Sequence, residues 1–84
     1  MQVQKIRQIT YIFDYEDYDI LKQKMKNIGI QTFTELARKI KVSNSYLSYV
    51  VTGQKAVTIK FFKKLKNVGI DMEVLNKYEN IWRN

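Results

Sequence analysis

Apolar side chains recur at intervals of three and four along separate stretches of this chain. The first stretch, residues 14–28, opens with the acid-rich run DYEDYD, and acidic side chains are favoured at the start of a helix by its dipole. Its apolar positions are Tyr18, Leu21, Met25 and Ile28. This spacing predicts an amphipathic helix that ends before Gly29, with Lys22 and Lys26 on its outer face.

A second and a third helix follow, joined by a very short connection. Thr32 stands three residues before Glu35 in TFTELARKI, which is the spacing of a capping box at a helix start. Ser43 is the expected N-cap of the next helix, SNSYLSYVV. Because only residues 40–42 separate the two helices, the chain must turn a sharp corner of the kind found in a helix-turn-helix. The inward-facing residues are predicted to be Leu36, Ala37 and Ile40 in the second helix, and Leu47, Val50 and Val51 in the third.

Two more helices are predicted after residue 57. The stretch TIKFFKKLKNVG has apolar residues on one side and lysines on the other, and Gly69 marks its end. The stretch DMEVLNKYENIW begins with Asp71 as a cap. The apolar positions are Phe61, Phe62, Leu65 and Val68 in the fourth helix, and Val74, Leu75, Tyr78, Ile81 and Trp82 in the fifth.

The N-terminal stretch, residues 3–13, is rich in β-branched and aromatic residues. Alternation of Ile9, Tyr11 and Phe13 favours a short strand or an extended arm, although the spacing of the apolar residues also suits a helix. A lone strand must pair with something, and the equivalent strand of a second chain is a natural candidate.

These elements together predict one all-α domain that spans residues 1–84. The chain has three Gly and no Pro, so residues that interrupt helices are sparse. We expect five helices in all. An N-terminal arm or strand covers residues 1–16, a core with four of the helices covers residues 17–70, and the C-terminal helix covers residues 71–84.

Composition limits the chemistry that this domain can perform. Without Cys or His, no disulfide, thiolate nucleophile or Cys/His metal site can form, and the usual general base is missing. We therefore expect neither an enzyme nor a protein that holds a metal or another cofactor. No apolar run is long enough to span a bilayer, and the first residues lack the apolar core of a signal peptide, so we expect a cytoplasmic protein without a membrane partner.

Charge is concentrated in the middle of the chain. Residues 20–66 hold eleven basic residues and a single acid, Glu35, whereas the two ends are mildly acidic. A basic block of this kind is typical of proteins that bind polyanions. A lysine-rich solvated surface would give the same count.

The sequence from about Tyr18 to Asp71 resembles the Cro/CI-type (XRE) family of helix-turn-helix DNA-binding repressors. The resemblance rests on the capping box, ELA, the short turn and VSNSYLSYVVTG, followed by a basic helix. The residues that carry it are Leu36, Ala37, Ile40, Val42, Ser43, Leu47, Ser48, Val50 and Gly53. It implies a five-helix lambda-repressor-like fold whose recognition helix, residues 43–52, enters the major groove of DNA.

Three positions depart from the family pattern. Lys41 stands where the family commonly has Gly, so a non-glycine residue must tolerate a strained backbone there. Phe33 replaces a Gln that contacts phosphate, and a core or corner-packing role suits it better. Val51 stands where the family often has a Glu that pairs with a basic side chain of the first helix. Lys26 therefore lacks that partner and could face phosphate instead.

Side chains on the outer face of the recognition helix can bond to base edges. Ser43 is more simply a cap, and Tyr46 lies at the flank, where packing and phosphate contact are both open. Arg38, Lys39, Lys63 and Lys64 are more simply solvated surface. The predicted base contacts are Asn44, Ser45, Ser48 and Tyr49, and the predicted phosphate contacts are Thr52, Gln54, Lys55, Lys60, Lys26, Lys41 and Tyr46.

The resemblance also implies a homodimer on a palindromic operator. Either end of the chain could build its interface, or both ends could fold back and enlarge the core. Lys5 and Arg7 could instead make the arm a minor-groove reader. The candidate interface residues are Ile9, Tyr11, Phe13, Tyr78, Ile81 and Trp82.

Taken together, the residues and the resemblance predict a sequence-specific regulator of transcription that binds double-stranded DNA. A repressor of a phage, plasmid or other mobile element in a bacterial cell fits the small size. The alternatives are a protein-binding module, such as an antitoxin or antirepressor, and a non-specific chromatin or RNA binder.

Overall fold

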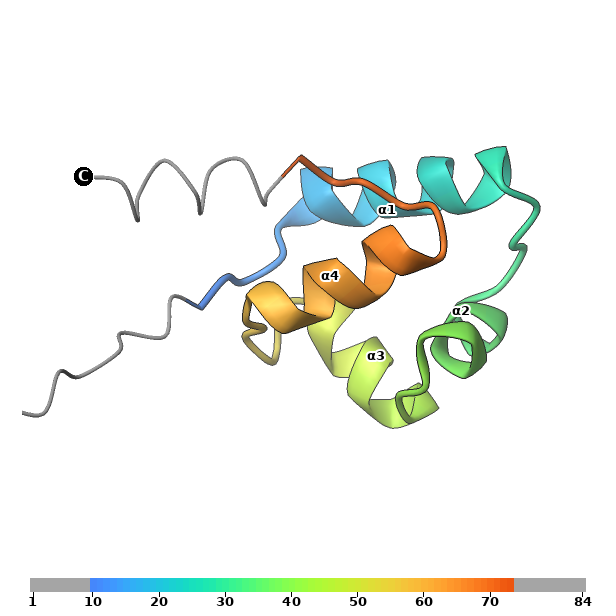
Figure 1. Cartoon of the computed structure of the whole chain (residues 1–84). Helices are drawn as coiled ribbons and strands as arrows, with labels where there is room; N and C mark the ends of the chain where they lie inside the picture. The colour runs from blue at the N-terminus through green and yellow to red at the C-terminus, as the bar shows by residue number, and fades with distance from the viewer. Residues whose placement is uncertain (1–9, 74–84) are drawn as a thin grey trace, which may run out of the picture.

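The computed structural model describes residues 10–73 and places four α-helices in them. They are α1 (Tyr15–Asn27), α2 (Phe33–Ile40), α3 (Asn44–Val51) and α4 (Ile59–Asn67). Figure 1 shows α1 along the top of the molecule, with α2 and α3 below it. The all-α prediction is thus confirmed for the first four helices. The expected fifth helix falls beyond Glu73, outside the residues that the structure describes.

Helix α1 begins at a reciprocal cap formed by two carboxylates. The Asp14 side chain accepts a hydrogen bond from the Asp17 backbone N–H at 2.9 Å, and the Asp17 side chain accepts one from the Asp14 backbone N–H at 3.1 Å. The hydrogen bond from the Asp17 backbone is the main reason why the pKa of Asp14 lies below its ordinary value. The acids of DYEDYD therefore do mark a helix start, as predicted.

Asp17 is the one polar residue that is buried among residues 10–73, with 7% of its surface exposed. Its carboxylate also accepts a hydrogen bond from the Tyr11 hydroxyl at 2.8 Å. This bond ties the segment before α1 to the first turn of the helix.

The segment that leads into α1 is not helical, and it pairs with another part of the same chain. Tyr11 and Val57 exchange two backbone hydrogen bonds of 2.8 and 2.9 Å and form an isolated antiparallel bridge. Between residues 10 and 73 this bridge is the only β-type pairing, so the segment finds a partner within its own chain. Residues 10–14 are not helical, in line with the predicted arm, but residues 15 and 16, which the prediction placed in the arm, already belong to α1.

The rings of Phe13 and Tyr11 pack against the core, as predicted for an arm that folds back on it. Phe13 is buried, stacks on Phe62 with ring centroids 6.0 Å apart, and meets Phe61 edge to face at 6.1 Å. Tyr11 packs on Phe62 at 5.7 Å. Phe13 is thus part of the core, and Tyr11 is partly buried against it. The other interface candidates, Ile9, Tyr78, Ile81 and Trp82, lie outside the described residues.

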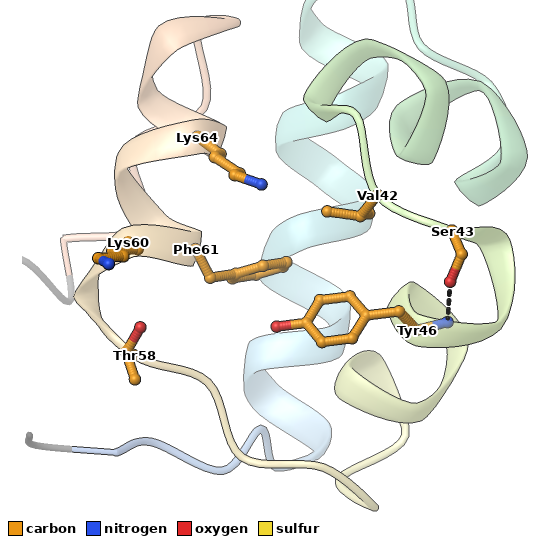
Figure 2. Close-up of a pocket in the computed structure, with 7 residues that line it drawn as sticks. All are labelled: Val42, Ser43, Tyr46, Thr58, Lys60, Phe61 and Lys64. Carbon is orange, nitrogen blue, oxygen red and sulfur yellow. Dashed lines mark hydrogen bonds between the residues drawn. The ribbon is translucent and has the colours of Figure 1, made fainter.

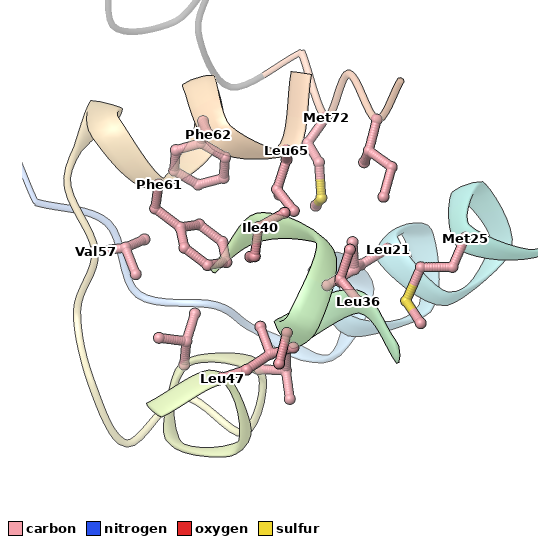
Figure 3. Close-up of a cluster of buried hydrophobic side chains, with 14 of the residues drawn as sticks. Leu21, Met25, Leu36, Ile40, Leu47, Val57, Phe61, Phe62, Leu65 and Met72 are labelled. Carbon is pink, nitrogen blue, oxygen red and sulfur yellow. The ribbon is translucent and has the colours of Figure 1, made fainter. Parts of the chain in front are cut away.

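One hydrophobic core joins all four helices (Figure 3). Most of the predicted inward positions are buried in it, but Ile28 is 41% exposed because it forms the C-cap of α1 rather than another turn. The buried apolar residues are Phe13, Leu21, Met25, Ile30, Leu36, Ala37, Ile40, Leu47, Val50, Val51, Val57, Phe61, Phe62, Leu65, Ile70 and Met72.

Helices α2 and α3 meet at the predicted corner. The Thr32 hydroxyl accepts the Glu35 backbone N–H at 3.1 Å, but the Glu35 carboxylate bonds to the backbone N–H of Gln31 rather than to that of Thr32. The capping box is therefore only half formed. Lys41 ends α2 in the left-handed region (φ 61°, ψ 46°), which is the strained backbone that its place in the turn predicts.

The described part of the chain ends with a turn at residues 71–73 rather than with the start of a helix. The Asp71 side chain accepts the Glu73 backbone N–H at 2.8 Å, but Glu73 has a φ of 65°, which is not helical. The predicted helix start at Asp71 is therefore wrong. None of the helices described here is long and apolar enough to cross a membrane.

Candidate nucleic-acid interface

Helix α3 has one buried edge and one exposed edge. Leu47 and Val50 are fully buried and Val51 nearly so, and they anchor the helix in the core as predicted. The Ser43 hydroxyl accepts the Tyr46 backbone N–H at 3.0 Å, which confirms Ser43 as the cap. The exposed edge carries the side chains Asn44, Ser45, Ser48, Tyr49 and Thr52.

Tyr49 is the largest side chain on this exposed edge. It is 51% exposed, and its ring makes no close contact with another aromatic ring among residues 10–73. Its backbone carbonyl accepts the N–H groups of Gln54 and Lys55 at 2.8 and 3.1 Å, so the chain after α3 wraps back on the last turn. A half-exposed phenol on an anchored helix presents both an apolar face and a hydroxyl to a partner.

Asn44 is held in place by α2. Its side-chain oxygen accepts a hydrogen bond from the Thr34 hydroxyl at 3.3 Å. The contact is long for a bond between oxygens, and the Asn44 amide nitrogen keeps its two donors.

Two of the predicted phosphate contacts are partly committed within the chain. The Thr52 hydroxyl donates to the backbone carbonyl of Ser48 at 2.7 Å, and it accepts a hydrogen bond from the Gln54 side chain at 3.0 Å. The Thr52 donor is therefore used by the end of α3, whereas Gln54 keeps a side-chain N–H and its carbonyl. These bonds could not be read from the sequence, because they depend on how the turn after α3 folds.

Tyr46, whose role the sequence left open, is half-buried between α3 and α4. Its ring packs on Phe61 with centroids 6.4 Å apart, and Lys55 Nζ lies 5.8 Å from the centre of the ring. The ring thus has a packing role and holds a lysine beside α3.

The other predicted lysines lie at different distances from α3 along the chain. Lys41 is exposed at the turn that leads into α3, and Lys60 is exposed in the first turn of α4. Lys26 lies in the last turn of α1. It is therefore the only one of these three lysines on a helix that does not adjoin α3 along the chain.

The sequence predicts that Lys64 is solvated surface, and it does not indicate Thr58 as a functional residue. Both line a cavity that Tyr46 and Lys60 also line, between α3 and α4 (Figure 2). The sequence does indicate that Lys60 and Lys64 lie together, because residues four apart share one face of a helix. That this face meets Tyr46 follows only from the packing of α3 on α4.

Comparison of the chain with protein-family models, with curated proteins and with solved structures returned no match. Within residues 10–73, no group of three or more His, Cys, Asp or Glu side chains is placed to hold a metal ion.

Proposed function

We propose that this chain binds double-stranded DNA sequence-specifically and regulates transcription, as a small repressor of a phage, plasmid or other mobile element. Helices α2 and α3 act as a helix-turn-helix of the XRE type, and α3 enters the major groove. The observation that carries the proposal is the exposed edge of α3, whose side chains all carry hydrogen-bonding groups while the opposite edge is locked into the core.

The surroundings of α3 suit a DNA backbone on both sides. Lys41 precedes the helix, and Lys55 and Lys60 follow it. Cations beside a recognition helix would hold it in register on the phosphates, while the helix itself reads the bases. Asn44 can pair with adenine through its carboxamide, and the Tyr49 ring can meet a thymine methyl group.

Selection of bound DNA from a random pool, followed by mobility-shift titrations at two salt concentrations, tests the proposal. We expect a palindromic consensus and an affinity that falls as salt rises. Tyr49→Ala should cost about 1–3 kcal/mol on the consensus site and relax its specificity. The matched control is Tyr15→Ala, because it removes a 93% exposed phenol from α1 rather than from α3. Equal effects of the two substitutions, or binding without any sequence preference, would contradict a reading role for α3.

Two copies of the chain would bind half-sites about one helical turn apart, roughly 34 Å. Because Phe13 is buried in the core, it is the weakest of the interface candidates. Sedimentation of the free chain and of its complex with the selected site measures the stoichiometry. A single copy on a non-palindromic site would remove the dimer from the proposal.

The alternative is a protein-binding module, such as an antitoxin or antirepressor. It is favoured by an apolar surface before and at the start of α1, where Ile12 is 61% exposed and Tyr15 stands beside a cavity of about 620 Å³. The same two substitutions separate the functions. A stoichiometric protein partner that is lost with Tyr15→Ala but kept with Tyr49→Ala would favour this alternative.

A further inference from the structure

A cavity of about 470 Å³ opens between the start of α3 and the first turns of α4. Its floor is apolar, and its polar groups lie around the rim. Figure 2 shows the Tyr46 ring reaching from α3 toward α4, with Thr58 and Lys60 on one side of the gap and Lys64 extending over it. The lining residues are Val42, Ser43, Tyr46, Thr58, Lys60, Phe61 and Lys64.

Two hydroxyl groups at this cavity have no partner among the described residues. Thr58 is the N-cap residue of α4, but its side chain makes no capping hydrogen bond. The Tyr46 ring is fixed by Phe61, while its hydroxyl takes part in none of the hydrogen bonds within residues 10–73. Each hydroxyl can therefore donate a hydrogen bond to a ligand.

The charges around the cavity are of one sign. Lys60 and Lys64 both line it, and no carboxylate does. Like charges four residues apart on a helix repel each other, so this pair weakens α4 unless an anion lies between the two ammonium groups. A third cation, Lys55, lies over the Tyr46 ring. Lys63 lies on α4 between Lys60 and Lys64 but does not line the cavity.

We propose that this cavity binds a phosphoryl group, held between Lys60 and Lys64 and bonded by the hydroxyls of Tyr46 and Thr58. A tetrahedral phosphate, with one negative charge in a phosphodiester and up to two in free phosphate, offers several acceptor oxygens to two ammonium and two hydroxyl donors. The phosphoryl group can belong to a DNA backbone or to a free phosphate. Only the choice of DNA as its source rests on the proposed function.

Titration of the whole chain with inorganic phosphate, in chloride at constant ionic strength and followed by amide NMR, tests the cavity without DNA. Phosphate should shift the amides of Tyr46 and Thr58 and saturate. Lys64→Gln should weaken binding by about fivefold, as expected for one partly exposed charge contact, and Lys63→Gln should leave it unchanged. Tyr46→Phe keeps the packing on Phe61 and should weaken binding by the hydroxyl alone. Equal effects of Lys63→Gln and Lys64→Gln, or no saturable shift at the cavity, would overturn the proposal.

Mobility shifts with the same two lysine variants identify the source of the phosphoryl group. If it is a DNA phosphate, Lys64→Gln should lower the slope of log affinity against log salt by about 0.9, whereas Lys63→Gln should not. Saturable phosphate binding with unchanged DNA slopes would assign the cavity to a free phosphorylated ligand. Phosphate binding by a chain that fails to bind DNA would refute the proposed function and leave the cavity standing.

Discussion

Replacing Lys41 with Gly should stabilise this chain, although the change removes a side chain and adds none. Lys41 ends α2 with φ 61° and ψ 46°, a left-handed conformation that costs a residue with a Cβ about 1–2 kcal/mol. Glycine avoids this cost but loses about 0.4–1 kcal/mol through the greater freedom of the unfolded chain. The difference between the midpoints is a gain of about 0.8 kcal/mol, which corresponds to a rise in Tm of about 3–6 °C for a domain of this size.

Lys39→Gly is the matched control, because it makes the same chemical change two residues earlier. Lys39 is exposed inside α2, where glycine costs about 1 kcal/mol and should lower Tm by about 4–8 °C. Thermal unfolding followed by circular dichroism measures both variants at one salt concentration. If Lys41→Gly lowers Tm as far as Lys39→Gly does, Lys41 is not left-handed and the α2–α3 corner has been wrongly described.

Lys41→Gly also separates stability from the proposed function. The same substitution removes a cation beside α3, so the slope of log DNA affinity against log salt should fall by about 0.9 if Lys41 contacts a phosphate. The variant would then be more stable than the parent chain and bind DNA less tightly. An unchanged slope would assign Lys41 to the turn alone.

Two further substitutions test how the N-terminal segment is held. Gly53→Ala and Gly29→Ala both place a Cβ on a residue with a φ near 80°. At position 53 the new Cβ would lie 2.9 Å from the Phe13 carbonyl oxygen, whereas at position 29 it would meet no atom within 4 Å. Chemical denaturation should therefore show a larger loss of stability for Gly53→Ala, and equal losses would mean that Phe13 does not pack there. The depressed pKa of Asp14 means that its carboxylate stabilises the fold above the unfolded-state value of 3.8, and this contribution is lost as the pH falls through the lower folded value. Asp14→Asn should thus leave a shallower decline of stability in acid, whereas an unchanged decline would assign the acid sensitivity to other groups.

The sequence was most informative where local chemistry decides the structure. Thr32 and Ser43 cap their helices because a hydroxyl at that position accepts a backbone N–H of the first turn. Leu47 and Val50 are buried because helical periodicity puts them on one side of α3. The corner between α2 and α3 follows from the length of the link, since only a tight turn fits there.

The sequence was least informative where distant segments meet. Alternation of apolar residues around Tyr11 predicts an extended conformation, but it contains no information about which segment pairs with it. The partner, Val57, is selected by the packing of Phe13 against Phe61 and Phe62. The cavity beside Tyr46 was missed for the same reason, because its walls come from two helices whose approach is set by the whole core.

The bridge between Tyr11 and Val57 makes the intervening chain a closed loop. Its two backbone hydrogen bonds join the segment before α1 to the segment before α4, so the proposed DNA-reading helix lies within a loop of chain whose two ends are held together by this bridge. If this loop unfolds as one unit, opening of α3 and release of the bridge occur together. We therefore expect the amides of Tyr11 and Val57 to exchange with solvent as slowly as those of Leu47 and Val50, as one cooperative unit. Release of the bridge would then link changes in the N-terminal segment to local unfolding of the proposed DNA-reading helix.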